Sequence, residues 1–281
     1  MLRLLRATYR GPLSPCDYET LRLYLALGYW PHLRCPRSLN EKIVHRELFN
    51  QHPLSPVIAD KWRVREYVES KGLKRILNDV YFVVDAADRI PFADLPDKYV
   101  IKPNHGSGCC VVVRDRRAAD VEAIVAQCEA WLKLRVSSLS RTYVTHYDSI
   151  PPRIVVERFI EDERYAVPTD YKFLCFHGRV RYLYVIDRSG VQSTCTFFDP
   201  EWRKLPISYD YPVAESVPRP ARLAEMVEVA ERLSAGFDFV RVDLYSPNDS
   251  AVVFGEMTLS PTAGNGVFRP REWDFKLGEL W

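Results

Sequence analysis

The sequence predicts an α+β protein whose sheets are largely antiparallel. Three observations support this fold class. Residues 1–75 carry helical patterns broken by prolines, and short runs of β-branched and aromatic residues take over from residue 76. Helices and strands then alternate irregularly, without the strand–helix–strand rhythm of a parallel sheet. Near the C-terminus, two alternating runs flank a turn cluster, which predicts a β-hairpin.

Four stretches have the spacing and end signals of helices. The stretch SLNEKIVHRELFN begins with Ser38 or Asn40 as its N-terminal cap, because both side chains accept hydrogen bonds from a first helical turn. The stretch ADKWRVREYVESKG ends at Gly72. Further along, RAADVEAIVAQCEAWLKLR and ARLAEMVEVAERLSAG repeat apolar residues at helical spacing, and Gly236 closes the second of them.

The remaining apolar runs are interpreted as strands: VYFVV, YVIKPN, CCVVVRD, RIVVERFI, DYKFLCFHGRVRYLYVIDR and QSTCTFFD. Cys109 and Cys110 fall inside one of these runs. The seven cysteines are an odd number without a CxxC pair, which disfavours a disulfide framework or a zinc site. We therefore expect reduced thiols in a cytoplasmic protein.

Composition excludes several classes of protein. The 281 residues are 47% hydrophobic, which is sufficient for a packed core. Their net charge is +2, so no strong attraction to nucleic acid is expected. No apolar run reaches the roughly 18 residues that span a membrane. The start, MLRLLRATYRG, lacks the pattern of a signal peptide. We interpret it as a docked or frayed first helix, with a weak membrane-surface contact as the alternative.

The C-terminal hairpin, RVDLYSPNDSAVVFGEMTLSP, places two carboxylates face to face. Arg241 and Asp243 share one face of the first strand, and Phe254, Glu256 and Thr258 share one face of the second. A turn within PNDS makes Asp243 and Glu256 direct cross-strand partners, with Cβ atoms about 5 Å apart. Two such carboxylates repel each other unless something neutralises them. Bound Mg²⁺ would do so, and Arg241 would add a second positive group.

A second candidate feature is the stretch YVIKPNHGSGCCVVV. Gly106, Ser107 and Gly108 form a tight turn whose glycines allow backbone N–H groups to approach an anion closely. Lys102 stands at the root of the turn and supplies a point charge for phosphates. No helix follows, so this is neither a dinucleotide fingerprint nor a Walker A motif. Taken alone, it is more often only a hairpin.

Three other charged positions have ordinary explanations when each is taken alone. Lys61, after Asp60 at a helix start, is typical of a solvated residue beside a cap. Glu157 ends an apolar strand, where a glutamate usually faces solvent. Asp170 and Lys172 share one face of a strand and are compatible with the wet side of a sheet.

In combination these stretches resemble the TupA-like branch of the ATP-grasp proteins, which is found with bacterial cell-surface polysaccharide genes. The resemblance covers roughly residues 36–275. It rests on blocks that occur in the same order: PRSLNEKI, ADKWRVREYV, LPDKYVIKPNHGSG, VVERFI, DYKFLCFHG, FDFVRVDLY, FGEMTLSP and FRPREWDFKLG. It implies two α+β lobes that clasp ATP: a helical segment at 1–75, a small lobe at 76–155 and a large lobe at 156–281.

The resemblance also implies a role for each candidate residue. Arg241 and Lys172 are the catalytic cations. Asp243, Glu256 and Thr258 correspond to the Mg²⁺ site, although many relatives in the wider superfamily have asparagine where Thr258 stands. Asp170 binds the ribose, with Glu163 as the alternative. The residues that contact ATP are Lys61, Lys102, Gly106, Ser107, Gly108, Glu157, Phe159, Ile160, Asp170 and Lys172.

The implied activity is that of an ATP- and Mg²⁺-dependent ligase, which joins a carboxylate to an amine through an acyl phosphate. In the TupA-like branch the acid is expected to be a uronic acid of a polysaccharide and the amine an amino acid. Two alternatives remain open, a kinase that phosphorylates a hydroxyl group and a non-catalytic binding module. Basic residues that could hold an acidic saccharide are Arg141, Arg179, Arg181, Arg203 and Arg269.

Overall fold

The computed structural model describes residues 8–106, 108–165, 167–188, 190 and 192–281. Among these residues the strands form a four-stranded, a five-stranded and a two-stranded sheet, and every strand pair is antiparallel. The expected α+β class with antiparallel sheets is therefore confirmed. In the described part of the chain, no helix is long and apolar enough to cross a membrane.

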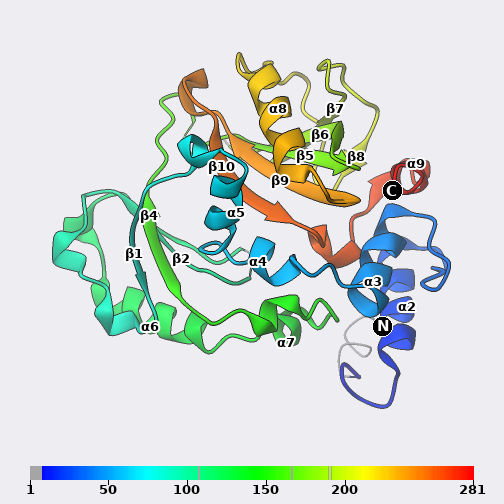
Figure 1. Cartoon of the computed structure of the whole chain (residues 1–281), viewed down its shortest axis with the longest axis horizontal. Coiled ribbons are helices and arrows are strands. Elements are labelled where there is room, and N and C mark those ends of the chain that lie inside the picture. The colour runs from blue at the N-terminus through cyan, green and yellow to red at the C-terminus, as the bar shows by residue number, and fades with distance from the viewer. Residues whose placement is uncertain (1–7, 107, 166, 189, 191) are drawn as a thin grey trace.

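The N-terminal part is helical, as expected. Its elements are α2 (Pro15–Leu27), α3 (Leu39–Phe49), α4 (Ser55–Ala59), α5 (Val64–Ser70) and η1 (Lys74–Ile76). Of the two caps considered for α3, Ser38 is the one used: its side chain accepts from the Glu41 N–H, and the Glu41 carboxylate accepts from the Ser38 N–H. In Figure 1, α3 lies beside the C-terminal helix α9 (Glu272–Gly278), and α2 packs against α3.

The first sheet has the order β1-β4-β2-β3. Its strands are β1 (Val80–Val84), β2 (Tyr99–Pro103), β3 (Val111–Val113) and β4 (Ile154–Arg158). Helix α6 (Val121–Leu132) packs Ile124, Cys128 and Trp131 against the sheet (Figure 1). The connections contain η2 (Ala87–Arg89), η3 (Phe92–Asp94), η4 (Arg116–Ala118), α7 (Val136–Ser140) and η5 (His146–Ser149).

Two details of this sheet differ from the sequence interpretation or refine it. Cys109 and Cys110 were expected inside a strand, but β3 begins only at Val111, because the glycine turn before it extends further than the apolar run suggests. The proposed lobe boundary after residue 155 falls within β4. We therefore propose to draw this boundary after Arg158.

The second sheet has the order β10-β9-β5-β6-β7. Its strands are β5 (Asp170–Phe176), β6 (Arg179–Asp187), β7 (Thr194–Phe198), β9 (Phe239–Tyr245) and β10 (Val253–Thr258). Helix α8 (Leu223–Ser234) covers one face (Figure 1). The hairpin turn contains η6 (Pro247–Asp249). After β10 the chain forms η7 (Pro261–Gly264), and β11 (Phe268–Arg269) pairs with β8 (Ser208–Tyr209).

The face opposite α8 is divided along its strands. Toward one end it is apolar, where Leu174, Phe176 and Phe239 pack in a core that includes Leu39 and Ile43 of α3. Toward the other end the same strands carry charged side chains, namely Asp170, Lys172, Arg241 and Asp243. One half of the face thus anchors the N-terminal helices, and the other half is available for chemistry.

Arg46 of α3 ties the helical segment to the second sheet. Its guanidinium donates to the backbone carbonyls of Phe239, at 3.0 Å, and Leu259, and it pairs with Asp238 at 2.9 Å. The arginine is 4% exposed. Because both carbonyls are shielded from water, they depend on this side chain for hydrogen bonds.

We expect Arg46→Met to lower the free energy of unfolding by about 3 kcal/mol, because two buried carbonyls lose their donor. Urea unfolding followed by circular dichroism measures this change. Arg117→Gln, at an exposed arginine, is the matched control and should change stability by less than about 0.5 kcal/mol. Equal stability of Arg46→Met and the native chain would contradict the anchoring role.

Candidate functional site

A cavity of about 580 Å³ lies between the two sheets. This volume is within the range of small-molecule sites. The first sheet contributes Val100, Lys102 and Glu157, and the second contributes Lys172 and Asp243, among others. The predicted site residues that line the cavity are Lys61, Lys102, Gly108, Glu157, Phe159, Ile160, Asp170, Lys172, Asp243 and Glu256.

The hairpin brings Asp243 and Glu256 together as direct cross-strand partners, as predicted. Arg241 joins them. Its Nε donates to Asp243 Oδ1 at 2.7 Å, and its Nη2 donates to Asp243 Oδ2 at 2.8 Å and to Glu256 Oε1 at 2.6 Å. Its Nη1 donates to the Tyr184 hydroxyl at 3.3 Å. Arg241 itself does not line the cavity and lies behind the carboxylates.

A β-bulge at Gly255 sets this arrangement. Phe254 pairs with Leu244, whereas Glu256 pairs with Asp243, so one residue of β10 is unpaired between them. The expectation that Phe254 and Glu256 share a face was wrong, because the bulge turns Phe254 into the core on the α8 side. A Cβ at Gly255 would lie 2.9 Å from the Asp243 carbonyl oxygen, so this position requires glycine.

Lys172 extends the charged cluster to β5. It pairs directly with Asp243 across the β5–β9 ladder, and its Nζ donates to Asp243 Oδ2 and lies 2.7 Å from Asp170 Oδ2. Arg188 approaches the same Asp170 oxygen at 3.8 Å. The second oxygen of this carboxylate, Asp170 Oδ1, is buried and has no hydrogen-bond partner among the described residues. It is therefore available to a ligand.

The two hairpin carboxylates differ electrostatically. Burial raises the pKa of Asp243 to about 6, although Arg241 and Lys172 act in the opposite direction. Burial also acts on Glu256, but the cations led by Arg241 outweigh it and lower the pKa of this group to about 2. The Glu256 side chain keeps 36% of its surface exposed, whereas that of Asp243 keeps 1%. At neutral pH Glu256 is thus the more accessible anion.

The glycine turn lies over a pair of lysines. The Lys61 backbone N–H donates to Asn104 O at 2.8 Å, and its Nζ donates to the carbonyl of Gly106. Lys102 Nζ pairs with Glu157 Oε1 at 2.5 Å across the first sheet. Burial lowers the pKa of Lys61, with Glu256 acting against the shift. Both lysines line the same cavity as the hairpin carboxylates.

Two glycines of the turn adopt the positive φ angles that were predicted for it. Gly106 has φ +81° and Gly108 has φ +72°, both in the left-handed region that favours glycine. Ser107, which was assigned to the same turn, lies outside the described residues. Gly106 does not line the cavity, whereas Gly108 does.

The end of β4 forms an apolar wall of the cavity. Phe159 and Ile160 follow the strand, and the Arg114 guanidinium lies 4.8 Å from the centre of the Phe159 ring. Glu163, the alternative ribose ligand, lines an adjoining hollow that also contains Lys98 and shares Arg114 and Phe159 with the main cavity. Of the two candidates for the ribose, only Asp170 faces the main cavity.

The residues fit a magnesium ion held together with phosphates, rather than a metal held by protein alone. The described residues contain no group of three or more histidine, cysteine or acidic side chains placed to bind a metal. Mg²⁺ needs none, because it usually keeps several waters and takes one or two carboxylates plus substrate phosphates. Asp243 and Glu256 supply that carboxylate pair. Thr258 does not line the cavity, and its hydroxyl accepts a hydrogen bond from the Ser260 N–H at 3.4 Å.

Several residues of the site were not identified from the sequence. Tyr245 lines the cavity, and its alternation with Asp243 along β9 was a usable signal. Arg188 and Tyr184 come from β6 or its end and reach the site only because β5 and β6 pair. The predicted saccharide ligands Arg179 and Arg203 lie in exposed ion pairs with Glu231 and Asp199.

Comparison with known proteins places this geometry in a family. Residues 41–281 match the family model described as TupA-like ATP-grasp. A search of curated protein sequences found no significant match.

Solved structures of low identity also match the chain, with TM-scores below 0.5. The D-alanine–D-alanine ligase of Bacillus anthracis bound to ATP is 14% identical, with a TM-score of 0.43, over 72% of this chain and 54% of that one. The L-amino acid ligase of Bacillus licheniformis is 17% identical, with a TM-score of 0.44, over 79% and 46%. A RimK-domain ATP-grasp protein of Sphaerobacter thermophilus is 15% identical, with a TM-score of 0.44, over 87% and 77%.

The chain therefore spans about half the length of the first two ligases. The family match covers most of its residues, including all three sheets and the hairpin. The chain belongs to the TupA-like ATP-grasp family.

Proposed function

We propose that this protein is an ATP-dependent carboxylate–amine ligase that forms an amide through an acyl phosphate. The observation that carries the proposal is the pair Asp243 and Glu256, bridged by Arg241 and facing a cavity that Lys61 and Lys102 also line. Such an arrangement suits a polyphosphate and its metal ion, since cations and carboxylates alternate around one space.

Each part of the cavity is assigned to a part of ATP. We assign Lys61, Lys102 and the glycine turn to the phosphates, because these groups offer cationic and backbone N–H donors. The wall formed by Phe159 and Ile160 suits the adenine ring. The unpartnered oxygen of Asp170 suits a ribose hydroxyl, which would donate a hydrogen bond to it.

Asp243 and Glu256 would hold Mg²⁺. When bound, the ion would neutralise phosphate charge and so ease transfer of the phosphoryl group. The chain's own cations act in the same direction. Lys172 and Lys102 face the cavity, and Arg241 lies directly behind the carboxylates, so all three stabilise negative charge that spreads over the γ-phosphoryl oxygens.

The proposed reaction has two steps. A substrate carboxylate oxygen attacks the γ-phosphorus, the bond to the β-phosphate oxygen breaks, and ADP leaves. An amine nitrogen then attacks the acyl carbon, phosphate leaves with the electron pair of the carbon–oxygen bond, and the nitrogen gives up a proton. No nucleophilic side chain is required, and the glycine turn over Lys61 would keep water from the acyl phosphate.

We further propose that the acid is a uronic acid of a cell-surface polysaccharide or its precursor, and that the protein works in the cytoplasm. The assignment rests on the resemblance stated above, which implies a role with cell-surface polysaccharides, and on the family match. A kinase acting on a hydroxyl group would use the same nucleotide site. The two activities differ in whether ADP release depends on an amine.

We expect the native chain to bind MgATP, and Asp243→Asn or Glu256→Gln to weaken metal-dependent affinity by at least about tenfold, because each removes a hard oxygen anion. Isothermal calorimetry with and without Mg²⁺ measures this. Glu228→Gln, at an exposed residue of α8, is the control and should bind like the native chain. Thermal melting without ligand establishes that each variant is folded.

Hydroxylamine separates the ligase from the kinase. An acyl phosphate reacts with hydroxylamine to give a hydroxamate, so ATP, a uronic acid and hydroxylamine should together yield hydroxamate and ADP. Stoichiometric ADP with a phosphorylated sugar and no hydroxamate would favour the kinase. Native protein without any affinity for MgATP would overturn the nucleotide site itself.

Arg241 should also be the counter-ion of the ligand-free site. We expect Arg241→Gln to cost about 3 kcal/mol of unfolding free energy, because two carboxylates remain close together in a poorly solvated place. Adding Glu256→Gln should restore part of that loss, and so should millimolar Mg²⁺. Urea unfolding of the native chain, both single variants and the double variant gives the coupling energy. Strictly additive effects would contradict the bridging role.

A further inference from the structure

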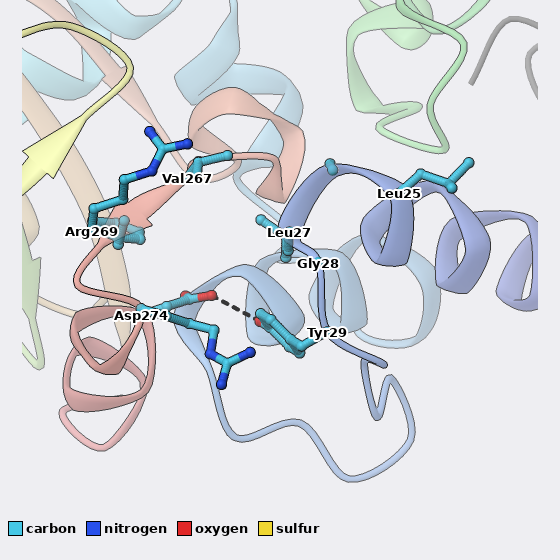
Figure 2. A pocket seen from close by; sticks show the side chains of 11 residues that line it. Leu25, Leu27, Gly28, Tyr29, Val267, Arg269 and Asp274 are labelled. Carbon is cyan, nitrogen blue, oxygen red and sulfur yellow. Dashed lines mark hydrogen bonds between the residues drawn. The ribbon is translucent and has the colours of Figure 1, made fainter. Parts of the chain in front are cut away.

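A second cavity, of about 330 Å³, lies away from the nucleotide site, between the end of α2 and the segment before α9. Figure 2 shows the two walls: Leu25, Leu27 and Gly28 come from the N-terminal part of the chain, and Val267 and Arg269 come from the C-terminal part. No residue lines both this cavity and the nucleotide cavity. Its volume is sufficient for a small ligand.

Two arginines line this cavity without an anionic partner. Arg269 and Arg271 are exposed, and neither makes an ion pair or side-chain hydrogen bond among the residues that the structure describes. By contrast, the exposed Arg179 and Arg203 are paired with Glu231 and Asp199. Arginine presents a planar set of donors that matches a carboxylate or a phosphate. The cavity therefore offers two anion-binding groups.

The opposite wall offers hydrogen-bond acceptors. Helix α2 ends at Leu27, and the Gly28 N–H donates to the carbonyl of Tyr24. The next three carbonyls, those of residues 25–27, accept no backbone or side-chain hydrogen bond within the described part of the chain. The last carbonyls of a helix need partners from outside it. Ligand hydroxyl groups can donate to them.

The acidic residue of the cavity is already satisfied. Asp274 Oδ1 accepts from the Asn40 N–H at 3.0 Å, and Oδ2 accepts from Asn40 Nδ2 at 2.9 Å and from the Tyr29 hydroxyl at 2.8 Å (Figure 2). Asp274 is 2% exposed. Its hydrogen bonds join the two walls, and both of its carboxylate oxygens already accept hydrogen bonds from protein donors.

One aromatic ring lines the cavity, and two exposed rings neighbour its lining residues in the sequence. Tyr29 lines it, and the Arg271 guanidinium lies 5.8 Å from the centre of that ring. Next to the lining residues in the chain, Tyr24 and Trp30 are 41% and 56% exposed, with ring centres 5.5 Å apart. Exposed aromatic faces of this kind pack against the apolar faces of sugar rings.

We propose that this cavity binds an acidic saccharide, with Arg269 and Arg271 each on a separate carboxylate of the ligand and the carbonyls of residues 25–27 on sugar hydroxyls. The combination selects a polyhydroxylated acid, because a simple anion leaves the carbonyls unpaired and a neutral sugar leaves the arginines unpaired. The identification of this ligand as the acid-bearing substrate of the ligase rests on the proposed function. Binding itself requires neither ATP nor catalysis.

The test is calorimetric titration of the full chain with trigalacturonate at low salt. We expect saturable binding, and an at least tenfold loss of affinity in Arg269→Gln/Arg271→Gln, because each arginine supplies charge-assisted hydrogen bonds. The control variant Arg117→Gln/Arg219→Gln removes the same charge from exposed positions outside the cavity and should bind like the native chain. Thermal melting establishes that both double variants are folded.

Three results would overturn the proposal: no binding of trigalacturonate, equal loss in the control variant, or undiminished binding in the cavity variant. Two competitors test the ligand class. Maltotriose should not displace trigalacturonate, and inorganic phosphate should displace it only at much higher concentration. Full displacement by either at equal concentration contradicts an acidic saccharide. MgATP affinity is measured on the same samples, so a failed nucleotide site and a failed saccharide site give different patterns.

Discussion

The bridge from Arg241 to Asp243 and Glu256 is the interaction on which the site depends. Two carboxylates that face each other across a hairpin are stable only with positive charge between or beside them. Arg241 supplies it from behind, and Lys172 supplies it from the neighbouring strand. The charge of the acidic pair is thus balanced by the protein's own cations, at the place where we propose that Mg²⁺ binds. The bulge at Gly255 makes this bridge possible, since it aligns Glu256 with Asp243.

The sheet that carries this bridge serves two purposes on one face. Its apolar half packs against α3, and its charged half borders the cavity that we propose binds the nucleotide. Close packing in the first half limits how far the strands can shift in the second, so the charged side chains keep their spacing. The N-terminal helices therefore contribute to the geometry of the site. Among the described residues 8–76, only Lys61 and Arg65 line the cavity.

The sequence predicted the local features of this site better than the distant ones. Alternation along the strands and a short turn were sufficient to pair Asp243 with Glu256, because both signals lie within one hairpin. The bulge was not predicted, because the sequence still alternates through Phe254 and Glu256 as it would in a regular strand. No residue next to Gly255 signals the extra position. The contact between Lys172 and Asp243 joins residues 71 positions apart, and strand order is not encoded in local periodicity. The resemblance to the family assigned both residues to one site but did not predict this contact.

The segment after β10 connects the two cavities, and the N-terminal helices hold it. Ser260 donates to Glu47, Arg22 donates to the Ala263 carbonyl at 2.8 Å, and the Gly266 N–H donates to Asn40 Oδ1 at 3.2 Å. Within this segment Thr262 has φ +52°, a conformation that costs free energy and persists only where surrounding contacts fix it. Several buried polar side chains hydrogen-bond to this one short segment, so its backbone conformation is fixed by the N-terminal helices. The segment leads from the carboxylate pair to Arg269, so the N-terminal helices set the course of the chain between the two cavities.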